Sequence, residues 1–462
     1  MQYRYGSRAA AFALGLFIAL PVMGNPAPSN EELYQIIRQL QAQIEALKRQ
    51  VAGQQPPAAP KQRALEQQVQ EQQKQIEALA DEAAQARQQQ TASKTKLSGY
   101  GELHYNNLEA KGGVNPSARD REEVDFHRFV LFFGHDFSDR VRFFSELEVE
   151  HALVRDTDTD TDRSCVVNDA DADGVLEPGE VTCGTPSTNP RAGTGEVELE
   201  QAYLEFDLNN TWKAKGGLFL IPVGILNETH EPPSFFGVER NPVENAIIPS
   251  TWWAGGAGLT AQWGQGWSAD VAVHEGLNTN VGARYAVRSG RQKTSSARAE
   301  DLAATARLKW TGIPGFEWAA TYHHQADITQ SRDLNAGSAS LMETHLIWNR
   351  GAFGVRALYA AWDLDGNGPE LLGADQQEGY YLEPSWRFSP NWGVFARYNV
   401  WDNQAGSGVA PADPGDTEKQ QTDLGINWWP LQNVVVKADY QMQDNENEQD
   451  LEGFNLGIGY QF

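Results

Sequence analysis

Cysteine and enzyme signatures are both scarce in this long chain. Its 462 residues include two cysteines and four methionines. The sequence contains no G-x-S-x-G nucleophile motif, no H-E-x-x-H metal motif and no glycine-rich phosphate-binding loop. We therefore expect that the protein is not an enzyme.

Long apolar runs are scarce as well, and the longest lies at the start of the chain. Arg4 and Arg8 precede an apolar run over residues 9–22, which small residues follow. This run is too short to cross a bilayer comfortably, and its pattern is typical of a secretory signal peptide. We predict a signal peptide over residues 1–24, with a membrane anchor as the alternative. No later segment approaches 18 apolar residues, so we expect no membrane-spanning helix.

Positive charge is in short supply. Lysine and arginine together number 37, against 62 aspartates and glutamates, which gives a net charge of −25. A surface of this sign repels polyanions, so we expect no nucleic-acid partner.

The segment after the signal peptide, residues 25–96, carries a heptad pattern. Its apolar residues recur at spacings of four and three, which is typical of a coiled coil. A proline-rich stretch at 52–63 interrupts the pattern, because proline cannot continue a helix. Short isolated helices are marginal in water, so we predict an oligomeric α-helical coiled coil in the periplasm. A loosely helical polar spacer is the alternative.

From residue 97 onward the apolar period changes to two. At the end of the chain, Phe454, Leu456, Ile458, Tyr460 and Phe462 alternate with small or polar residues. Such alternation predicts strands with one apolar face. We predict sixteen strands, which begin near residues 97, 122, 140, 196, 212, 254, 267, 298, 316, 340, 352, 376, 392, 420, 433 and 452.

Tight turns and long loops alternate along this series of strands. A soluble sandwich also has alternating strands, but an even strand number with alternating connection lengths is typical of outer-membrane barrels. We therefore predict an all-β membrane barrel, a sixteen-stranded antiparallel transmembrane β-barrel over residues 97–462, in the outer membrane of a Gram-negative bacterium. Such a barrel is wide enough to hold water. The interfacial aromatic girdles are expected to include Trp253, Trp310, Trp318, Trp348, Trp392 and Trp428.

The long loop at residues 155–195 contains a calcium-binding pattern. The stretch "DADADGVLEPGE" matches the EF-hand loop in its oxygen ligands and its turn glycine. Strands are predicted on both sides of it, so we expect a structural Ca²⁺ ion and not a sensor; a disordered acidic loop is the alternative. Cys165 and Cys183 bracket the stretch, and in an exported chain we expect them to form a disulfide. The predicted ligands are Asp169, Asp171, Asp173, the carbonyl of Val175, and Glu180.

The next long loop, residues 221–253, is rich in proline, which limits its conformations. In general porins the third loop folds into the barrel and narrows it, and we predict the same here, with an external lid as the alternative. Charged side chains at a constriction set ion selectivity. The charged residues expected there are Glu228, His230, Glu231, Glu239, Arg240 and Glu244.

Three stretches resemble the phosphate-selective porin O and P family. They are "FHRFVLFFGHDFSDRVRFFSELEVE", "VELEQAYLEF" followed by "KGGLFLIPVG", and the closing "FNLGIGYQF". The resemblance implies a homotrimeric, sixteen-stranded porin with a narrow, solute-selective channel. It also implies that arginines lining the lumen attract anions.

Strand alternation predicts which charged side chains face the lumen. Acidic residues rival basic ones in this set, so the sequence leaves open whether anions or cations are preferred. The predicted pore-lining residues are Arg142, Glu146, Glu148, Glu150, Glu198, Glu200, Arg307, Lys309, Arg356, Arg387, Arg397 and Lys437, with Arg128, Glu317, Glu383 and Asp439 also expected on inner faces.

We expect an outer-membrane porin for passive diffusion of small hydrophilic solutes or ions, surrounded by lipid and lipopolysaccharide. One alternative is a substrate-specific channel for a phosphate-like anion or a metal chelate such as a siderophore. Another is a structural or adhesive calcium-binding surface barrel. His323, His324 and His345 fall on adjacent predicted strands, where we expect lumen residues rather than a metal site.

Overall fold

The computed structural model describes residues 94–462, apart from 114–115, 153–154, 163–164, 168–180, 184–186, 193–194, 407 and 409–417. Side chains between 153 and 194 also lie outside this description. The predicted signal peptide and calcium ligands, and residues 25–93 of the predicted coiled coil, therefore fall outside the described residues. The predicted end of the coiled coil at residue 96 was wrong, because Thr95 and Lys96 belong to the first barrel strand. Within the described part of the chain, no helix is both long enough and apolar enough to cross a bilayer.

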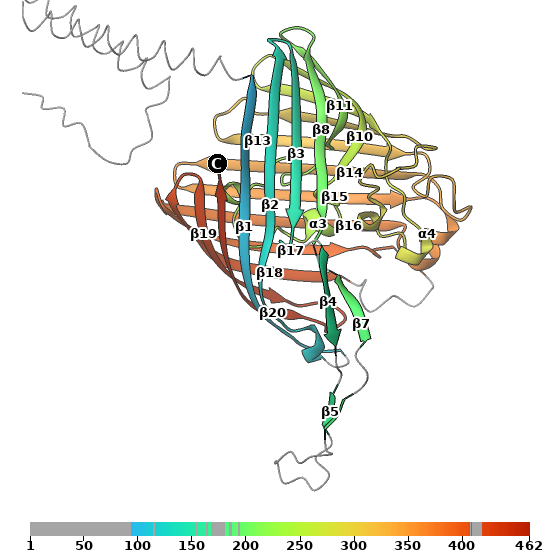
Figure 1. Cartoon of the computed structure of the whole chain (residues 1–462). Helices are drawn as coiled ribbons and strands as arrows, with labels where there is room; N and C mark the ends of the chain where they lie inside the picture. The colour runs from blue at the N-terminus through green and yellow to red at the C-terminus, as the bar shows by residue number, and fades with distance from the viewer. Residues whose placement is uncertain are drawn as a thin grey trace, which may run out of the picture. The chain divides into compact units, whose positions relative to one another are not determined.

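Sixteen antiparallel strands form a closed barrel, as the sequence predicted. Consecutive barrel strands pair with each other, and β1 closes the ring against β20 (Figure 1). The barrel strands are β1 (Thr95–Ala110), β2 (Arg121–Ser138), β3 (Val141–Glu150), β8 (Val197–Asp207), β9 (Trp212–Leu220), β10 (Trp253–Trp263), β11 (Trp267–His274), β12 (Ala303–Trp310), β13 (Phe316–Gln325), β14 (Ala339–Arg350), β15 (Phe353–Leu364), β16 (Gln376–Ser389), β17 (Trp392–Asp402), β18 (Lys419–Leu431), β19 (Val434–Gln443) and β20 (Leu451–Gln461).

One predicted strand start was wrong. The strand expected near 298 begins at Ala303. Residues 298–302 belong to the preceding loop, where glutamine side chains bind their backbone: Arg298 N donates to Gln292, and Asp301 N donates to Gln330. These bonds hold the segment away from the sheet ladder.

The outer face of the barrel is apolar and exposed. Along β12 the side chains of Ala304, Ala306 and Leu308 are exposed, whereas Thr305 and Arg307 between them are buried. The same alternation leaves Leu456 and Ile458 exposed on β20. Exposed apolar surface of this extent is unfavourable in water and is typical of a lipid-facing barrel wall.

Connections alternate between tight turns and long loops, as predicted. Tight turns such as 264–266 and 432–433 lie at one end, and the longer loops at the other, because antiparallel strands reverse direction at each turn. Short helical turns lie within the loops: η1 (Pro116–Arg119), η2 (Pro232–Ser234), α3 (Val243–Ala246), η3 (Val281–Ala283), η4 (Val287–Gly290) and α4 (Asn367–Leu372).

The loop between β3 and β8 contains two small hairpins. Strand β4 (Arg155–Asp162) pairs with β7 (Ser187–Ala192), and β5 (Cys165–Val167) pairs with β6 (Val181–Cys183). In the second pair Cys165 stands opposite Cys183. The disulfide and the calcium site at the end of this hairpin stay predictions.

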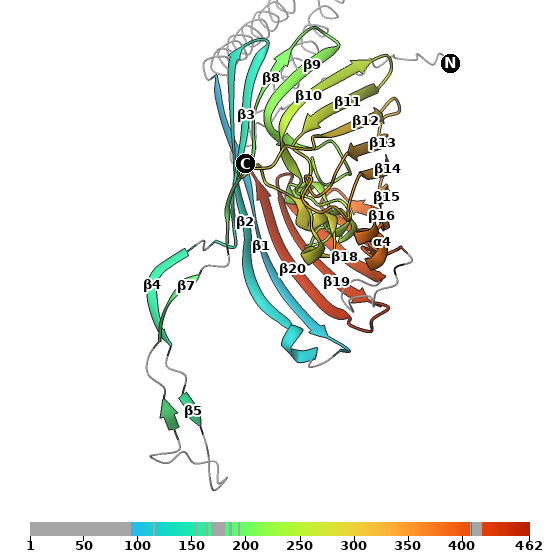
Figure 2. The same ribbon diagram turned by 90° about the vertical axis from the view of Figure 1, so that its right-hand side faces the viewer.

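The loop of residues 221–252, hereafter the inserted loop, lies inside the ring of strands (Figure 2). It contacts inward-facing groups on several walls. The backbone N–H of Val238 donates to Asp439 on β19, and the Trp362 indole on β15 donates to the carbonyl of Ile247. Phe236 packs against Phe395 on β17. An apolar cluster fills this part of the interior, and its members from the loop are Ile221, Val223, Ile225, Leu226, Phe235, Val243, Ile247, Ile248 and Trp252.

Buried backbone groups of the inserted loop are satisfied by its own side chains. The Glu244 carboxylate accepts hydrogen bonds from the backbone N–H groups of Ile225 (2.7 Å) and Leu226 (2.6 Å), and from the Tyr381 hydroxyl. Gly224 has φ +70°, and a Cβ there would stand 2.6 Å from the Glu244 carboxylate. Glycine is required at this position for the carboxylate to approach.

Asn227 joins the two ends of the inserted loop. Its side-chain amide donates to the carbonyls of Ile221 (2.8 Å) and Trp252 (3.0 Å), and its oxygen accepts from Trp252 N (2.6 Å). The residue is fully buried, so no water can replace these bonds. The hydrogen bonds fix the distance between the points where the loop leaves and rejoins the wall.

We expect Asn227→Ala to loosen the inserted loop while the barrel stays closed. The substitution leaves buried backbone groups unpaired, and each unpaired group costs about 1–3 kcal/mol. Limited proteolysis of the refolded protein should cut within 221–252 much faster than in the wild type. Asn349→Ala, at an exposed position beside a tight turn, is the control; equal cleavage in all three proteins would contradict the role given to Asn227.

Candidate pore constriction

A charged cavity of about 340 Å³ lies between the inserted loop, the loop of residues 275–302 and the inner wall. We call it the constriction cavity. Carboxylates on β3 and β8 form one side, and guanidinium groups from the two loops lie among its other lining residues. The residues lining it are Arg121, His127, Arg128, Glu150, His151, Glu198, Glu200, Glu239, Arg240, Glu244, Asn245, Ser250, Thr251, Trp253, Arg288, Arg291 and Lys293.

A β-bulge shapes the acidic side. The pairing of β3 with β8 shifts between Glu146 and Leu147, so Glu146 stands opposite Gln201 while Leu147 stands opposite Leu199. Glu200 is the extra residue, and both Glu200 and its neighbour Gln201 are buried. A bulge of this kind re-aims side chains, which brings Glu200 toward Glu146.

Arg128 compensates part of the acidic wall. Its guanidinium lies 2.9 Å from Glu102, 3.8 Å from Glu148 and 3.9 Å from Glu150. Lys293, from the loop 275–302, forms an ion pair with Glu198. Glu150 and Glu198 are therefore matched by cations, whereas Glu148 and Glu200 keep carboxylate oxygens without a hydrogen-bond donor among the described residues.

The guanidinium groups of Arg240, Arg288 and Arg291 have only neutral partners. Arg240 donates to the Thr251 hydroxyl (2.9 Å), Arg288 to the carbonyl of Ser250 (2.8 Å), and Arg291 to the carbonyl of Thr251 (2.7 Å). None of the three forms an ion pair with a carboxylate of residues that the structure describes. Nε of Arg240 and of Arg291 is buried without a hydrogen-bond acceptor.

Positive charge is concentrated at these three residues. Burial, together with the charges of Arg291 and Arg240, lowers the pKa of Arg288 to about 9. The side chain remains charged at neutral pH. A group of like charges with spare N–H donors is suited to hold an anion.

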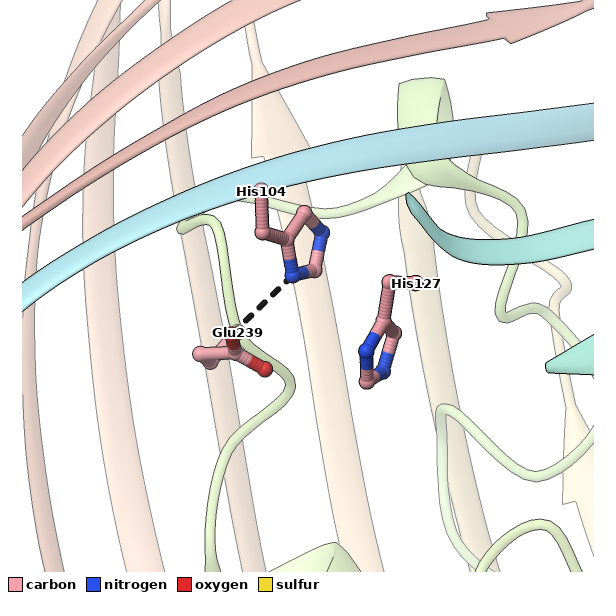
Figure 3. A group of neighbouring side chains, drawn as sticks. All are labelled: His104, His127 and Glu239. Atoms are coloured by element: carbon pink, nitrogen blue, oxygen red, sulfur yellow. Dashed lines mark hydrogen bonds and ion pairs between the residues drawn. The ribbon is translucent and has the colours of Figure 1, made fainter. Parts of the chain in front are cut away.

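Histidines attach the inserted loop to the opposite wall (Figure 3). His104 Nδ1 lies 3.0 Å from Glu239, and His104 Nε2 lies 3.4 Å from Glu102. The His104 ring stacks on the His127 ring, with centroids 4.7 Å apart. Burial opposes the ionised form of Glu239, but the hydrogen bond and charge of His104 hold the pKa of that carboxyl well below its usual range. Glu239 therefore stays ionised and attaches the inserted loop to His104 on β1.

Other predicted pore residues also lie on the inner wall, several of them in contact with the loop. Arg307 pairs with Asp270 (2.8 Å) and with Glu228 of the loop, Arg356 donates to the carbonyl of Ser234, and Arg397 pairs with Asp423 (2.9 Å). The remaining contacts are Lys309 with Glu317, Arg397 with Glu383, Lys437 with the Phe235 ring, Asp439 with Asn455, and Arg387 with the Trp429 ring.

Some predicted residues lie apart from the constriction cavity. Arg142 pairs with Glu205 and Asp207 next to the β2–β3 turn. Glu150 is eight residues farther along β3, or about 26 Å at 3.3 Å per residue. Arg142 and Arg240 therefore do not form one cluster. Glu231 is partly exposed and its side chain does not cap η2.

The structure separates the three histidines on β13 and β14. His323 and His345 are buried, and His324 is exposed on the other face of β13. His345 stands opposite Ala319 and bonds to Glu343, whereas His323 contacts the His274 ring.

Trp253 is not part of an aromatic girdle. It is 3 % exposed, and its ring faces Arg291 and Lys293 at the constriction cavity. By contrast, Trp392 and Trp428 are exposed and stack on each other on the outer face.

The basic residues of the loop 275–302 were not among the predicted site residues. Residues 284–293 read "RYAVRSGRQK", and no acidic residue occurs between Glu275 and Glu300. In so acidic a chain, this basic run is the signal that identifies the site.

Comparison with known proteins agrees with the fold and places the chain in a family. The family model for phosphate-selective porin O and P matches residues 100–462. An uncharacterised protein of Aquifex aeolicus (strain VF5) is 27 % identical over 402 residues, which cover 82 % of each chain.

Comparison with solved structures also gives matches over most of the chain. OprB of Pseudomonas putida matches with a TM-score of 0.51 and 13 % identity, over 82 % of this chain and 96 % of that one. The anion-selective porin from Comamonas acidovorans matches with a TM-score of 0.48 and 11 % identity, over 80 % of this chain and 99 % of that one. The chain thus belongs to the phosphate-selective porin O and P family and is an outer-membrane channel for passive diffusion of small hydrophilic solutes.

Proposed function

We propose that the channel prefers anions and that Arg240, Arg288 and Arg291 form its anion-binding constriction. The observation that carries this proposal is the absence of a carboxylate ion-pair partner for these three side chains within the described residues. An anion that enters the constriction cavity meets donors that no protein carboxylate occupies.

The numerous carboxylates of the cavity do not reverse this preference. Glu150 lies near Arg128, Glu198 pairs with Lys293, and Glu239 binds His104. Glu244 accepts hydrogen bonds from backbone and side-chain donors of the folded loop. Glu200 on β8 is the exception, because its Oε2 has no hydrogen-bond donor among the described residues. The three arginines place unpaired positive charge on the loop side of the cavity, and charge near a narrow pore sets which ions enter.

The same arrangement favours anions with several oxygen atoms. A guanidinium presents a planar set of donors that matches phosphate or carboxylate oxygens better than a spherical halide. We expect phosphate added to a chloride solution to block single-channel current saturably. Replacing Arg288 and Arg291 by Gln should raise the half-blocking concentration about tenfold or more, equivalent to about 1.4 kcal/mol.

Arg298→Gln is the matched control for that experiment. Arg298 lies in the same loop, but its guanidinium is paired with Glu300 at 2.8 Å on an exposed surface. This variant should be blocked like the wild type. Absence of saturable block in the wild type, or an unchanged half-blocking concentration in the double variant, would contradict the proposal.

We also propose that the hairpin of β5 and β6 carries a structural Ca²⁺ ion closed by the Cys165–Cys183 disulfide. The register that sets these cysteines opposite each other supports the closed hairpin, and the EF-hand pattern between them supplies the ligands. In calorimetric titration of the oxidised protein, Asp173→Asn should weaken Ca²⁺ binding about tenfold or more. Asp158→Asn, outside the twelve-residue pattern, should not; identical binding by wild type and Asp173→Asn would exclude the site.

We propose further that the protein is a homotrimer whose coiled coil, over residues 25–96, registers the three barrels. The heptad pattern and the family resemblance support this assembly. Light scattering of the full chain in detergent should give the mass of three copies, and a monomeric mass would refute it.

A further inference from the structure

We infer that Glu146, Glu200 and His230 form a binding site for a divalent transition-metal ion, with Zn²⁺ as the representative, between the inserted loop and the barrel wall. This inference does not depend on the proposed anion preference. Glu146 comes from β3, Glu200 from the bulge of β8, and His230 from the inserted loop. The ion would therefore join the loop to two strands.

The three ligand atoms have the spacing of a metal site. One nitrogen or oxygen atom from each residue lies within 4.8 Å of the others. His230 Nε2 is 3.3 Å from Glu146 Oε1 and 3.8 Å from Glu200 Oε2. Ligands that bind a tetrahedral zinc ion at 2.0–2.2 Å stand about 3.4 Å from one another. All three side chains are at least nine-tenths buried, with exposures of 0 %, 3 % and 3 %.

Neighbouring groups orient two of the ligands. His230 Nδ1 lies 3.3 Å from the carbonyl of Asn227, an arrangement in which Nδ1–H donates and Nε2 presents its lone pair to the carboxylates. The Gln201 amide donates to Glu146 Oε2 at 2.6 Å, which leaves Oε1 directed at His230. Such outer hydrogen bonds are characteristic of protein metal sites.

An independent observation also indicates a ligand. Glu200 Oε2, the oxygen that faces His230, accepts no hydrogen bond from any residue that the structure describes, although it is buried. The neighbouring Glu148 is 1 % exposed and both of its carboxylate oxygens lack a hydrogen-bond donor as well, although the Arg128 guanidinium lies 3.8 Å away. Buried carboxylates without donors are costly unless a cation compensates them.

The ligand set selects the type of ion. One imidazole and two carboxylates suit Zn²⁺ and related first-row ions, whereas Ca²⁺ and Mg²⁺ prefer ligand sets made only of oxygen. We therefore expect Zn²⁺ to bind in the presence of excess Ca²⁺.

The two other histidine clusters, His104 with His127 and Glu239, and Asp125 with His127 and His151, are less buried than this site. His127 Nε2 lies 2.8 Å from the Arg128 guanidinium, and its Nδ1 lies 3.0 Å from Asp125. His104 has a carboxylate at each ring nitrogen. His151 Nδ1 also contacts Asp125 Oδ2, at 2.8 Å. Both clusters share His127, whose two ring nitrogens already have partners within the protein.

Metal binding can be measured on the full-length protein in detergent after removal of metals with EDTA. Titration with ZnCl₂ in the presence of millimolar Ca²⁺ should show one tight site per chain. His230→Gln and Glu200→Gln should each weaken it on the order of 100-fold, and Gln201→Leu by about 10–100-fold. His127→Gln should bind like the wild type, because it alters only the two other clusters.

Zinc-edge X-ray absorption of the loaded wild type tests the site without any variant. The expected spectrum contains one imidazole nitrogen and carboxylate oxygens at 2.0–2.2 Å. Zn²⁺ should also slow proteolysis within residues 221–252. Absence of tight Zn²⁺ binding by the wild type, a spectrum without imidazole, or loss of binding in His127→Gln instead of His230→Gln would overturn the inference. Without tight Zn²⁺ binding, the contacts of His230 with Glu146 and Glu200 would serve only to hold the inserted loop to the barrel wall.

Discussion

The structure depends on the burial of the polar backbone groups of the inserted loop inside the barrel. Backbone N–H and C=O groups that leave water must find partners, and in the barrel wall the strand ladders supply them. The inserted loop has no ladder. The side chains of Asn227 and Glu244 supply hydrogen-bond partners instead, because each of them binds several backbone groups of the loop. Asn227 joins the two ends of the loop, and Glu244 joins its second half to Ile225 and Leu226 near its start.

The loop in turn determines where charge gathers. It carries Glu239 to His104 on one strand, Glu228 to Arg307 on another, and His230 to Glu146 on a third. These contacts leave the constriction cavity between the acidic strands β3 and β8 and the arginines of the two loops. In the proposed function, selectivity follows from which charges are paired, and not from the net charge of −25.

The fold and much of the inner wall could be predicted from sequence because strands have a period of two. Apolar residues such as Leu456 and Ile458 mark the outer face, and alternation then places Lys437 or Arg307 inside. The alternation of inward and outward side chains is interrupted at the β-bulge of β8. One extra residue at Glu200 turns two consecutive side chains inward, and nothing in "VELEQAYLEF" marks that position. Trp253 was assigned to an aromatic girdle because the sequence does not show that Arg291 and Lys293, from a later loop, cover its ring.

The site itself was only partly predictable. Charged residues of the inserted loop could be named, but their side-chain partners come from β1, β3, β12 and β16 through contacts that span up to 137 residues of sequence. The most consequential residues, Arg288 and Arg291, lie in a loop whose basic run is visible in the sequence. Which arginines lack carboxylate partners is a property of the folded chain alone.

The most direct test of this account is the zero-current potential of the wild-type channel in a planar bilayer under a salt gradient. We predict a sign that reports preferential anion passage, strongest at low ionic strength, where charge is least screened. A potential that reports cation preference would mean that the carboxylates of β3 and β8 control the pore, and it would contradict the account.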